Sequence, residues 1–195
     1  MALLVSLFAT TLLAGLGLAL VLLGSAESTL AARDVRAQAA AHAAHAALSL
    51  AEAEIRSRSN WGGVLTAGVS VDTCAEPGGF ADSSLTPPAP WDGSALDLHA
   101  LTAKRQSVSH GQVPSGMSDP VWRLFDYGPI SRLVPSDARR HPHYVVVWAA
   151  DGGGGTVLLY ATAMGPAEVV ASVEATVARG AGGTSLVRHA IRAQP

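Results

Sequence analysis

The sequence predicts an α+β protein in which a long N-terminal transmembrane and amphipathic helix packs on a C-terminal antiparallel β-sheet head. Three observations lead to this prediction. Residues 1–26 carry no charged side chain, and residues 27–58 are rich in alanine and lack Gly and Pro. From residue 121, β-branched and aromatic runs alternate with glycine-rich turns. We therefore divide the chain into an anchor with a continuing helical rod, residues 1–58, and a β-rich head, residues 59–195, with a loop region at 72–120.

The first element is an apolar run, residues 2–24, which is longer than the roughly 20 residues that a helix needs to cross a bilayer. A secretory signal peptide is the alternative, but its basic segment is missing and the run exceeds the usual apolar length of about 7–15 residues. The charges that follow are mixed in sign, so the positive-inside rule gives no orientation. We predict a membrane anchor with these lipid-facing side chains: Leu3, Leu4, Phe8, Leu12, Leu16, Leu20 and Leu23.

The second half of the helix is predicted from its alanine content and from two acid-before-base pairs at i,i+4, Glu52/Arg56 and Glu54/Arg58. A heptad stripe of mostly small side chains indicates a helix-packing or assembly face: Leu30, Asp34, Ala37, Ala41, Ala44, Leu48, Ala51 and Ile55. We assign a further group of alanines to the opposite face: Ala39, Ala40, Ala43, Ala46 and Ala47. A helix with apolar surface on more than one side should pack against more than one neighbour.

The head elements follow in order along the chain. Residues 60–63 end the helix, residues 64–71 read as a strand, residues 72–94 as a loop, residues 96–104 as a short helix and residues 107–120 as irregular. Five strands are predicted at residues 121–128, 143–150, 156–164, 168–180 and 184–191, with the glycine run after Asp151 as a hairpin turn. The strict alternation along residues 169–178 predicts a sheet with one face in water.

The composition and the polar residues argue against catalysis. A net charge of −2 with a single lysine gives no basic surface for nucleic acid. Cys74 is the only cysteine, so an internal disulfide is excluded and an unremarkable thiol is expected over an intermolecular bridge. The glycine run lacks the lysine of a P-loop, and a G-x-S-x-G elbow is missing. The aromatic residues Trp122, Phe125, Tyr127, Tyr144 and Trp148 fall in predicted strands, where packing is expected over a ligand cage.

Two groups of histidines have spacings that could bind a metal ion. His42 and His45 lie at i,i+3 on one helix face, but the sequence nearby offers no further ligand. His141 and His143, with Asp137 and Asp151, form a second loose group. We expect solvated or interfacial imidazoles at the first pair, and we predict a protein that is not an enzyme and that has no metal and no cofactor.

The N-terminal stretch ALLVSLFATTLLAGLGLALVLLGSAESTLAARDVRAQAAAHAAHAAL resembles the N-terminal segment of PilX-type minor pilins in the type IV pilin and pseudopilin superfamily. The head pieces LDLHALTAKRQ, PVWRLFDYGPISRLVP, HYVVVWAADG and LLYATAMGP…VEATVAR are also similar to parts of such proteins. The resemblance covers most of the chain. It implies a single-pass protein of the bacterial inner membrane with its head in the periplasm, which reaches the pilus or cell surface when assembled.

The function that the resemblance implies is that of a structural subunit that helps prime, assemble or cap type IV pilus filaments. The implied partners are other pilins, both major and minor, the pilus assembly machinery and inner-membrane lipid. The sequence departs from the pilin pattern at its start, where no basic leader precedes Met1; either this sequence is close to the mature form or its start lies downstream of the true one. If Met1 is the first mature residue, Val5 stands where most mature pilins carry glutamate. An unpaired ammonium in an apolar filament core is costly, so this departure favours a minor subunit. Two alternatives stay open: a K-type-like pseudopilin of type II secretion, and a membrane-tethered periplasmic binding module that does not join a filament.

Overall fold

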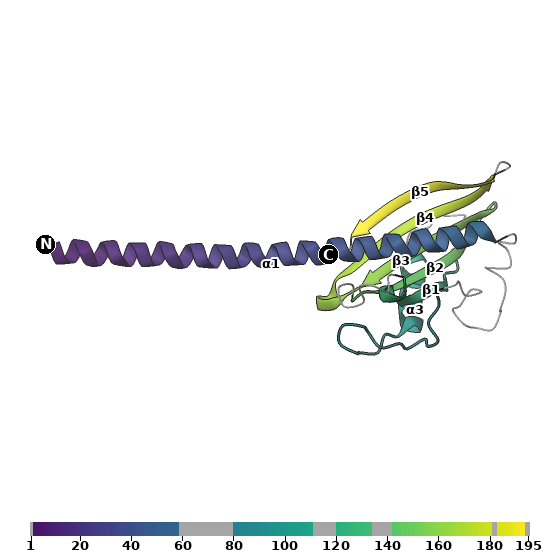
Figure 1. Cartoon of the computed structure of the whole chain (residues 1–195). Helices are drawn as coiled ribbons and strands as arrows, with labels where there is room; N and C mark the ends of the chain where they lie inside the picture. The colour runs from purple at the N-terminus through teal and green to yellow at the C-terminus, as the bar shows by residue number, and fades with distance from the viewer. Residues whose placement is uncertain (1, 59–79, 111–119, 134–141, 181–182, 194–195) are drawn as a thin grey trace. The chain divides into compact units, whose positions relative to one another are not determined.

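The computed structural model describes residues 2–58, 80–110, 120–133, 142–180 and 183–193 (Figure 1). The chain divides into two compact units, Met1–Gln38 and Ala39–Pro195. Helix α1 (Ala2–Ser57) supplies all of the described first unit and continues into the second. The predicted end of the helix at residues 60–63, the predicted strand at 64–71 and Cys74 lie outside the described residues.

Helix α1 confirms the prediction of a long uninterrupted N-terminal helix. Its last turns carry the two predicted ion pairs, in which Glu52 Oε2 lies 3.6 Å from Arg56 Nη2 and Glu54 Oε1 lies 2.7 Å from Arg58 Nη2. The acid precedes the base by one turn in both pairs, which is the order that stabilises a helix. The alanine-rich sequence and these pairs account for a helix that extends to Ser57.

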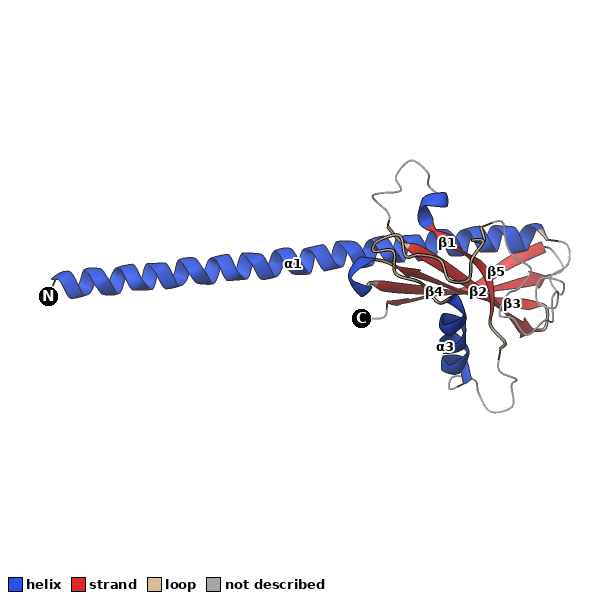
Figure 2. Ribbon diagram, turned by 90° about the horizontal axis from the view of Figure 1, so that it is seen from below, coloured by secondary structure: helices blue, strands red, loops and turns tan. Residues whose placement is uncertain are grey.

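The second unit contains a five-stranded antiparallel sheet in the order β1-β2-β3-β4-β5 (Figure 2). The bounds of the strands agree with the predicted runs to within a few residues: β1 Arg123–Pro129, β2 Tyr144–Gly153, β3 Thr156–Met164, β4 Val170–Gly180 and β5 Gly183–Ala193. The order in space equals the order in sequence because antiparallel neighbours need only short connections. The sheet is therefore a simple meander, as the closely spaced turn signals indicate.

The predicted hairpin after Asp151 connects β2 to β3. Gly153, Gly154 and Gly155 adopt φ values of +74°, +61° and +79°, a region that side chains with a Cβ enter at a cost. The Asp151 carboxylate accepts a hydrogen bond from Gly153 N–H at 2.8 Å, and the Thr156 hydroxyl donates to the Gly153 carbonyl. The turn thus explains the glycine run without a ligand.

One face of the sheet packs against the second part of α1. The alternate side chains of β2, β3 and β4 that point to this face include Val147, Leu159 and Val173, and they are buried with Leu48 and Ile55 of the helix. The predicted alternation along β4 is confirmed at Ala171, Val173, Ala175 and Val177, which are all buried. Each large aliphatic side chain buried here contributes about 1.5–3 kcal/mol relative to exposure.

The prediction that the other face lies in water was wrong over β1–β3, whereas Glu174 and Thr176 of β4 are half-exposed on that face. Helix α3 (Leu98–His110) and side chains from the segment before it, among them Trp91 and Leu96, cover this face over β1–β3. A second buried cluster here contains Leu98, Trp122 and Trp148, with Tyr160 packed against it. Figure 2 shows α1 and α3 on opposite faces of the sheet. The sequence of β2 accounts for the difference. Residues 144–150 are all apolar or aromatic, without the alternation of β4, and all are buried; a strand that is buried on both faces does not alternate.

Smaller differences concern polar positions and helix bounds. Ser172, predicted to face water, is 2% exposed and its hydroxyl lies 3.0 Å from the Thr162 hydroxyl of β3. Helix α3 was predicted at residues 96–104; it begins at Leu98 and extends to His110, so residues 107–110 of the predicted irregular region are helical. Packing of this helix on the sheet stabilises turns that local sequence alone does not favour. Residues 80–94, the described part of the loop predicted at 72–94, lie outside helices and named strands.

Candidate functional site

The first candidate site is the apolar stretch of α1. Every predicted anchor side chain is exposed within its own chain by more than half: Leu3, Leu4, Phe8, Leu12, Leu16, Leu20 and Leu23. The most apolar window of the helix has a mean hydropathy of 2.2 and is 0% buried. Contiguous apolar surface of this extent marks an interaction with a membrane or with other apolar surfaces. Within the described residues, α1 is the one helix long and apolar enough to span a membrane.

The hydroxyl groups in this stretch bond within the helix. Ser6 Oγ donates to the Leu3 carbonyl at 3.0 Å, Thr11 Oγ1 donates to the Phe8 carbonyl at 2.9 Å, and Thr10 Oγ1 contacts the carbonyls of Ser6 and Leu7. A hydroxyl that is hydrogen-bonded to its own helix costs less in hydrocarbon than an unsatisfied one. These polar residues are therefore compatible with a membrane span.

The second candidate site is the predicted helix-packing stripe. Ala44, Leu48, Ala51 and Ile55 are fully buried, and Ala41 packs against the same core at partial exposure. Leu30 and Ala37 of the stripe are exposed and belong to the first unit. The stripe residues from Ala44 onward thus contact the sheet of their own chain.

The alanines that we assigned to the opposite face are divided by the structure. Ala40, Ala43 and Ala47 are buried with the stripe, which corrects their assignment, whereas Ala46 is exposed. Successive residues of a helix are rotated by about 100°, so Ala40 and Ala47 lie close to Ala44 around the axis rather than opposite it. The outward face of this part of α1 carries the exposed residues His42, Ala46, Ser49, Leu50 and Ala53.

The histidine groups gain little support as a metal site. His42 is exposed, His45 is half-buried, and within the described residues three metal-ligating side chains do not gather anywhere. His143 is buried against Gly165, and Asp151 lies in the exposed hairpin at the opposite end of β2. Asp137 and His141 lie outside the described residues.

Strand β1 holds a buried carboxylate that was not predicted from the sequence. Asp126 of β1 is 1% exposed, and its Oδ1 accepts a hydrogen bond from the Phe80 N–H at 3.2 Å. Its Oδ2 has no hydrogen-bond partner among the described residues. Burial, followed by the nearby Glu54 carboxylate, raises the pKa of Asp126 to about 6, and the Phe80 N–H and Arg58 oppose this rise. The sequence signal is a single acid inside an apolar strand, in the run LFDYG.

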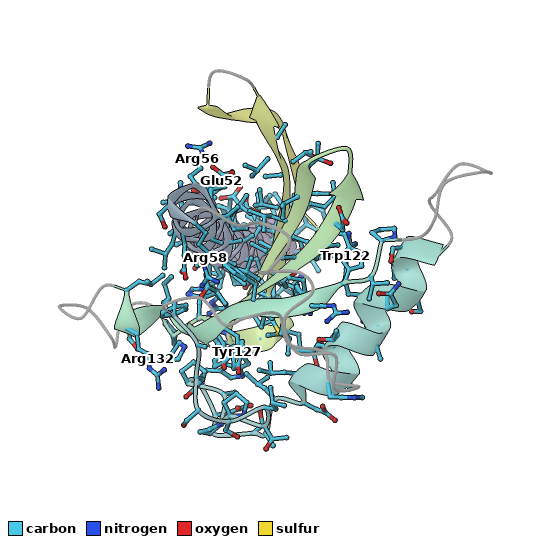
Figure 3. The ribbon with its side chains drawn as sticks, turned by 90° about the vertical axis from the view of Figure 1, so that its right-hand side faces the viewer. Glu52, Arg56, Arg58, Trp122, Tyr127 and Arg132 are labelled. Carbon is cyan, nitrogen blue, oxygen red and sulfur yellow. The ribbon has the colours of Figure 1, made fainter. Side chains whose placement is uncertain are left out.

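A β-bulge places Asp126 on the face that packs against α1. The register shifts between Leu124 and Asp126, so that Asp126 lies opposite Val147, whose side chain belongs to the α1 face. The bulged residue Phe125 is buried on this face too, and the Arg58 guanidinium lies 5.5 Å from the centre of its ring. Figure 3 shows Arg58 between the end of α1 and β1. A bulge re-aims side chains in this way.

The opposite face holds a group of aromatic rings around Arg105 of α3. Its guanidinium lies 3.7 Å from the centre of the Tyr160 ring and 4.3 Å from that of Trp122. Trp122, Phe125, Tyr127, Tyr144 and Trp148 are all buried, which confirms packing as their role. An internal cation already occupies the space between the rings, so the arrangement joins α3 to the sheet.

Models of known protein families, curated proteins and solved structures give no match to this chain. The fold and the exposed apolar stretch define the class as an α+β protein with an N-terminal helix that is long and apolar enough to anchor it in a membrane.

Proposed function

We propose that this chain is a pilin-like structural subunit, of the minor PilX type, that helps prime, assemble or cap type IV pilus filaments. One observation carries the proposal: a single helix exposes a membrane-length apolar stretch and, in its later turns, packs on an antiparallel sheet. This combination suits a subunit that is held in the membrane before assembly and in a helical filament core afterwards. In both places the apolar side chains of α1 leave water.

The outward face of α1 in the second unit supports contacts with neighbouring helices. Ala46 and Ala53 are exposed small residues on this face, and Leu50 is 36% exposed. Small side chains allow helices to approach closely. The role proposed is structural and non-enzymatic, with other pilins, the assembly machinery and inner-membrane lipid as partners. The proposed location is the bacterial inner membrane, with the head in the periplasm until the subunit is assembled.

The test places Glu at Ala46 in a strain that lacks the chromosomal copy and measures filament number and the amount of subunit in sheared filaments. We expect both to fall, because a buried unpaired carboxylate at a helix interface is costly. Ala46→Ser is the matched control and should assemble normally. The unfolding transition of the Ala46→Glu protein in detergent should stay unchanged, which separates assembly from folding.

Two outcomes would reject the filament role. If deletion of the gene leaves the number and function of pili intact and the protein stays entirely in the membrane, the tethered binding module replaces the proposal. If deletion abolishes type II secretion and leaves pili normal, the K-type-like pseudopilin replaces it.

A further inference from the structure

The outer edge of β1 is covered by a short segment, residues 80–82, which we call the clasp. Tyr127 N–H donates to the Phe80 carbonyl at 3.1 Å, and Asp82 N–H donates to the Tyr127 carbonyl at 2.8 Å. Ala81 forms a parallel bridge with Tyr127. The clasp therefore satisfies backbone groups that an edge strand would otherwise present to solvent or to another chain.

The side chains at the two ends of the clasp, Asp82 and Phe80, each contact the rest of the second unit. Asp82 Oδ1 lies 2.9 Å from Arg132 Nη2, in an ion pair whose arginine is 49% exposed and which therefore contributes little. The Phe80 ring is buried in the α1-side core and packs over Gly128, where a Cβ would lie 3.2 Å from the ring. Figure 3 shows Tyr127 and Arg132 below the end of α1 in that view.

The third contact is the hydrogen bond from Phe80 N–H to Asp126 Oδ1, at 3.2 Å. It joins the clasp to a carboxylate that is 1% exposed and whose Oδ2 has no hydrogen-bond partner within the described residues. A buried carboxylate with one oxygen that accepts no hydrogen bond costs free energy when it is ionised and much less when it is protonated. Exposure of Asp126 to water removes that cost.

We propose that the clasp is a proton-responsive cover of the β1 edge, closed while Asp126 is neutral and released more often when Asp126 is ionised. The inference does not rest on the proposed role in filaments. Release hydrates the carboxylate, and the proton leaves to solvent. The edge of β1 is then free to pair with another strand.

The charged groups around Asp126 are few in the described part of the chain. From α1, the Glu54 carboxylate favours the neutral form and the Arg58 guanidinium opposes it. From the clasp, Asp82 is paired with Arg132. Across the strand, the residue opposite Asp126 is Val147, which does not titrate. Burial and the Glu54 carboxylate together outweigh the Phe80 N–H and Arg58, so the Asp126 carboxyl is neutral at acidic pH.

The direction of the pH effect follows from linkage. Burial holds the pKa of Asp126 at about 6 in the closed state, against an ordinary value of 3.8. In the open state the pKa falls toward the ordinary value, so the closed state binds the proton more tightly. Opening therefore increases as pH rises through the interval between these two values. Between about pH 5 and about pH 7.5 we expect a roughly three- to tenfold increase in the opening equilibrium.

The experiment is amide hydrogen exchange of the full chain in detergent micelles, with rates divided by the intrinsic rate at each pH. The amides of Phe80, Asp82 and Tyr127, which donate the hydrogen bonds of the clasp, should lose protection by roughly three- to tenfold as pH rises, whereas amides in the middle of β3 should not change. Asp126→Asn should keep the protection of the low-pH state at every pH. Glu174→Gln, a matched acid-to-amide change on β4, should behave as the unmodified chain.

Two results would overturn the inference. One is a pH-dependent loss of protection that persists in Asp126→Asn, and the other is an equal loss at the clasp and in β3. If the Asp126→Asn variant does not fold, Glu54→Gln tests the same inference without altering Asp126. Removal of the Glu54 charge lowers the pKa of Asp126, so the pH midpoint of clasp opening must move to lower pH. An unchanged midpoint would reject the proton-responsive role of the clasp.

Discussion

Trp148 Nε1 donates a hydrogen bond of 2.8 Å to Thr102 Oγ1, and this contact joins the centre of β2 to α3. Both residues are 3% exposed, so water does not compete for the bond. The Thr102 hydroxyl in turn donates to the Leu98 carbonyl one helical turn earlier, at 2.8 Å. One hydroxyl therefore satisfies the indole and fixes the position of α3 on the sheet.

Replacement of Thr102 by Val should destabilise the second unit. The change preserves shape but leaves the buried indole N–H without its acceptor, which costs about 1–3 kcal/mol. Urea unfolding monitored by tryptophan fluorescence measures the loss. Thr102→Ser restores the hydroxyl and should recover most of the stability, and Ala103→Val on the exposed side of α3 is the control. Equal stability of the Val and Ser variants would contradict the proposed importance of the bond.

The stability of the protein should fall with rising pH because of Asp126. The folded-state pKa of about 6 lies above the ordinary value of 3.8, so the contribution is fully present below the ordinary value and is lost as pH rises through the folded value. The total amounts to about 2–3 kcal/mol, since each pKa unit corresponds to about 1.4 kcal/mol. Asp126→Asn should flatten unfolding curves measured across this interval and should be more stable than the unmodified chain at neutral pH. A pH profile that the substitution leaves unchanged would contradict this assignment.

The turn between β3 and β4 contains two strained residues. Ala167 and Glu168 adopt φ values of +60° and +59°, a left-handed conformation that costs about 1–2 kcal/mol for a residue with a Cβ. Glu168→Gly should raise the unfolding free energy by about 1 kcal/mol, less the added chain entropy of glycine. Thermal unfolding measures the gain as an increase in Tm. Gly152→Ala is a useful contrast, because its Cβ would meet the Thr156 hydroxyl and Leu158, so that variant should lose stability.

The apolar stretch of α1 should decide the solubility of the chain. The full-length protein should fractionate with membranes and require detergent, because residues 2–24 transfer favourably into hydrocarbon. A fragment that begins at Thr29 should be soluble without detergent and should show a cooperative unfolding transition. Recovery of the full-length chain as a freely soluble monomer would contradict the anchor.

The sequence by itself was sufficient to predict the elements that depend on the pattern of neighbouring residues. An uncharged apolar run followed by alanine-rich turns determined α1, and the glycine run after Asp151 determined the β2–β3 hairpin. These features depend on backbone preferences and on spacing along the chain, which are visible in a single sequence. The exposure of the anchor side chains was predictable for the same reason, because they lie in one uncharged apolar run and the part of the chain that the structure describes does not bury them.

Only the tertiary structure decided which surfaces meet. Helix α3 covers the second face of the sheet through contacts between residues far apart in the chain, such as Thr102 and Trp148. The bulge at Phe125 turns Asp126 toward the last turns of α1, and a shift of register by one residue reverses the face of a side chain. The physical reason is that burial and pairing across the sheet depend on the positions of several elements at once, whereas helix and turn formation depend on neighbours in sequence.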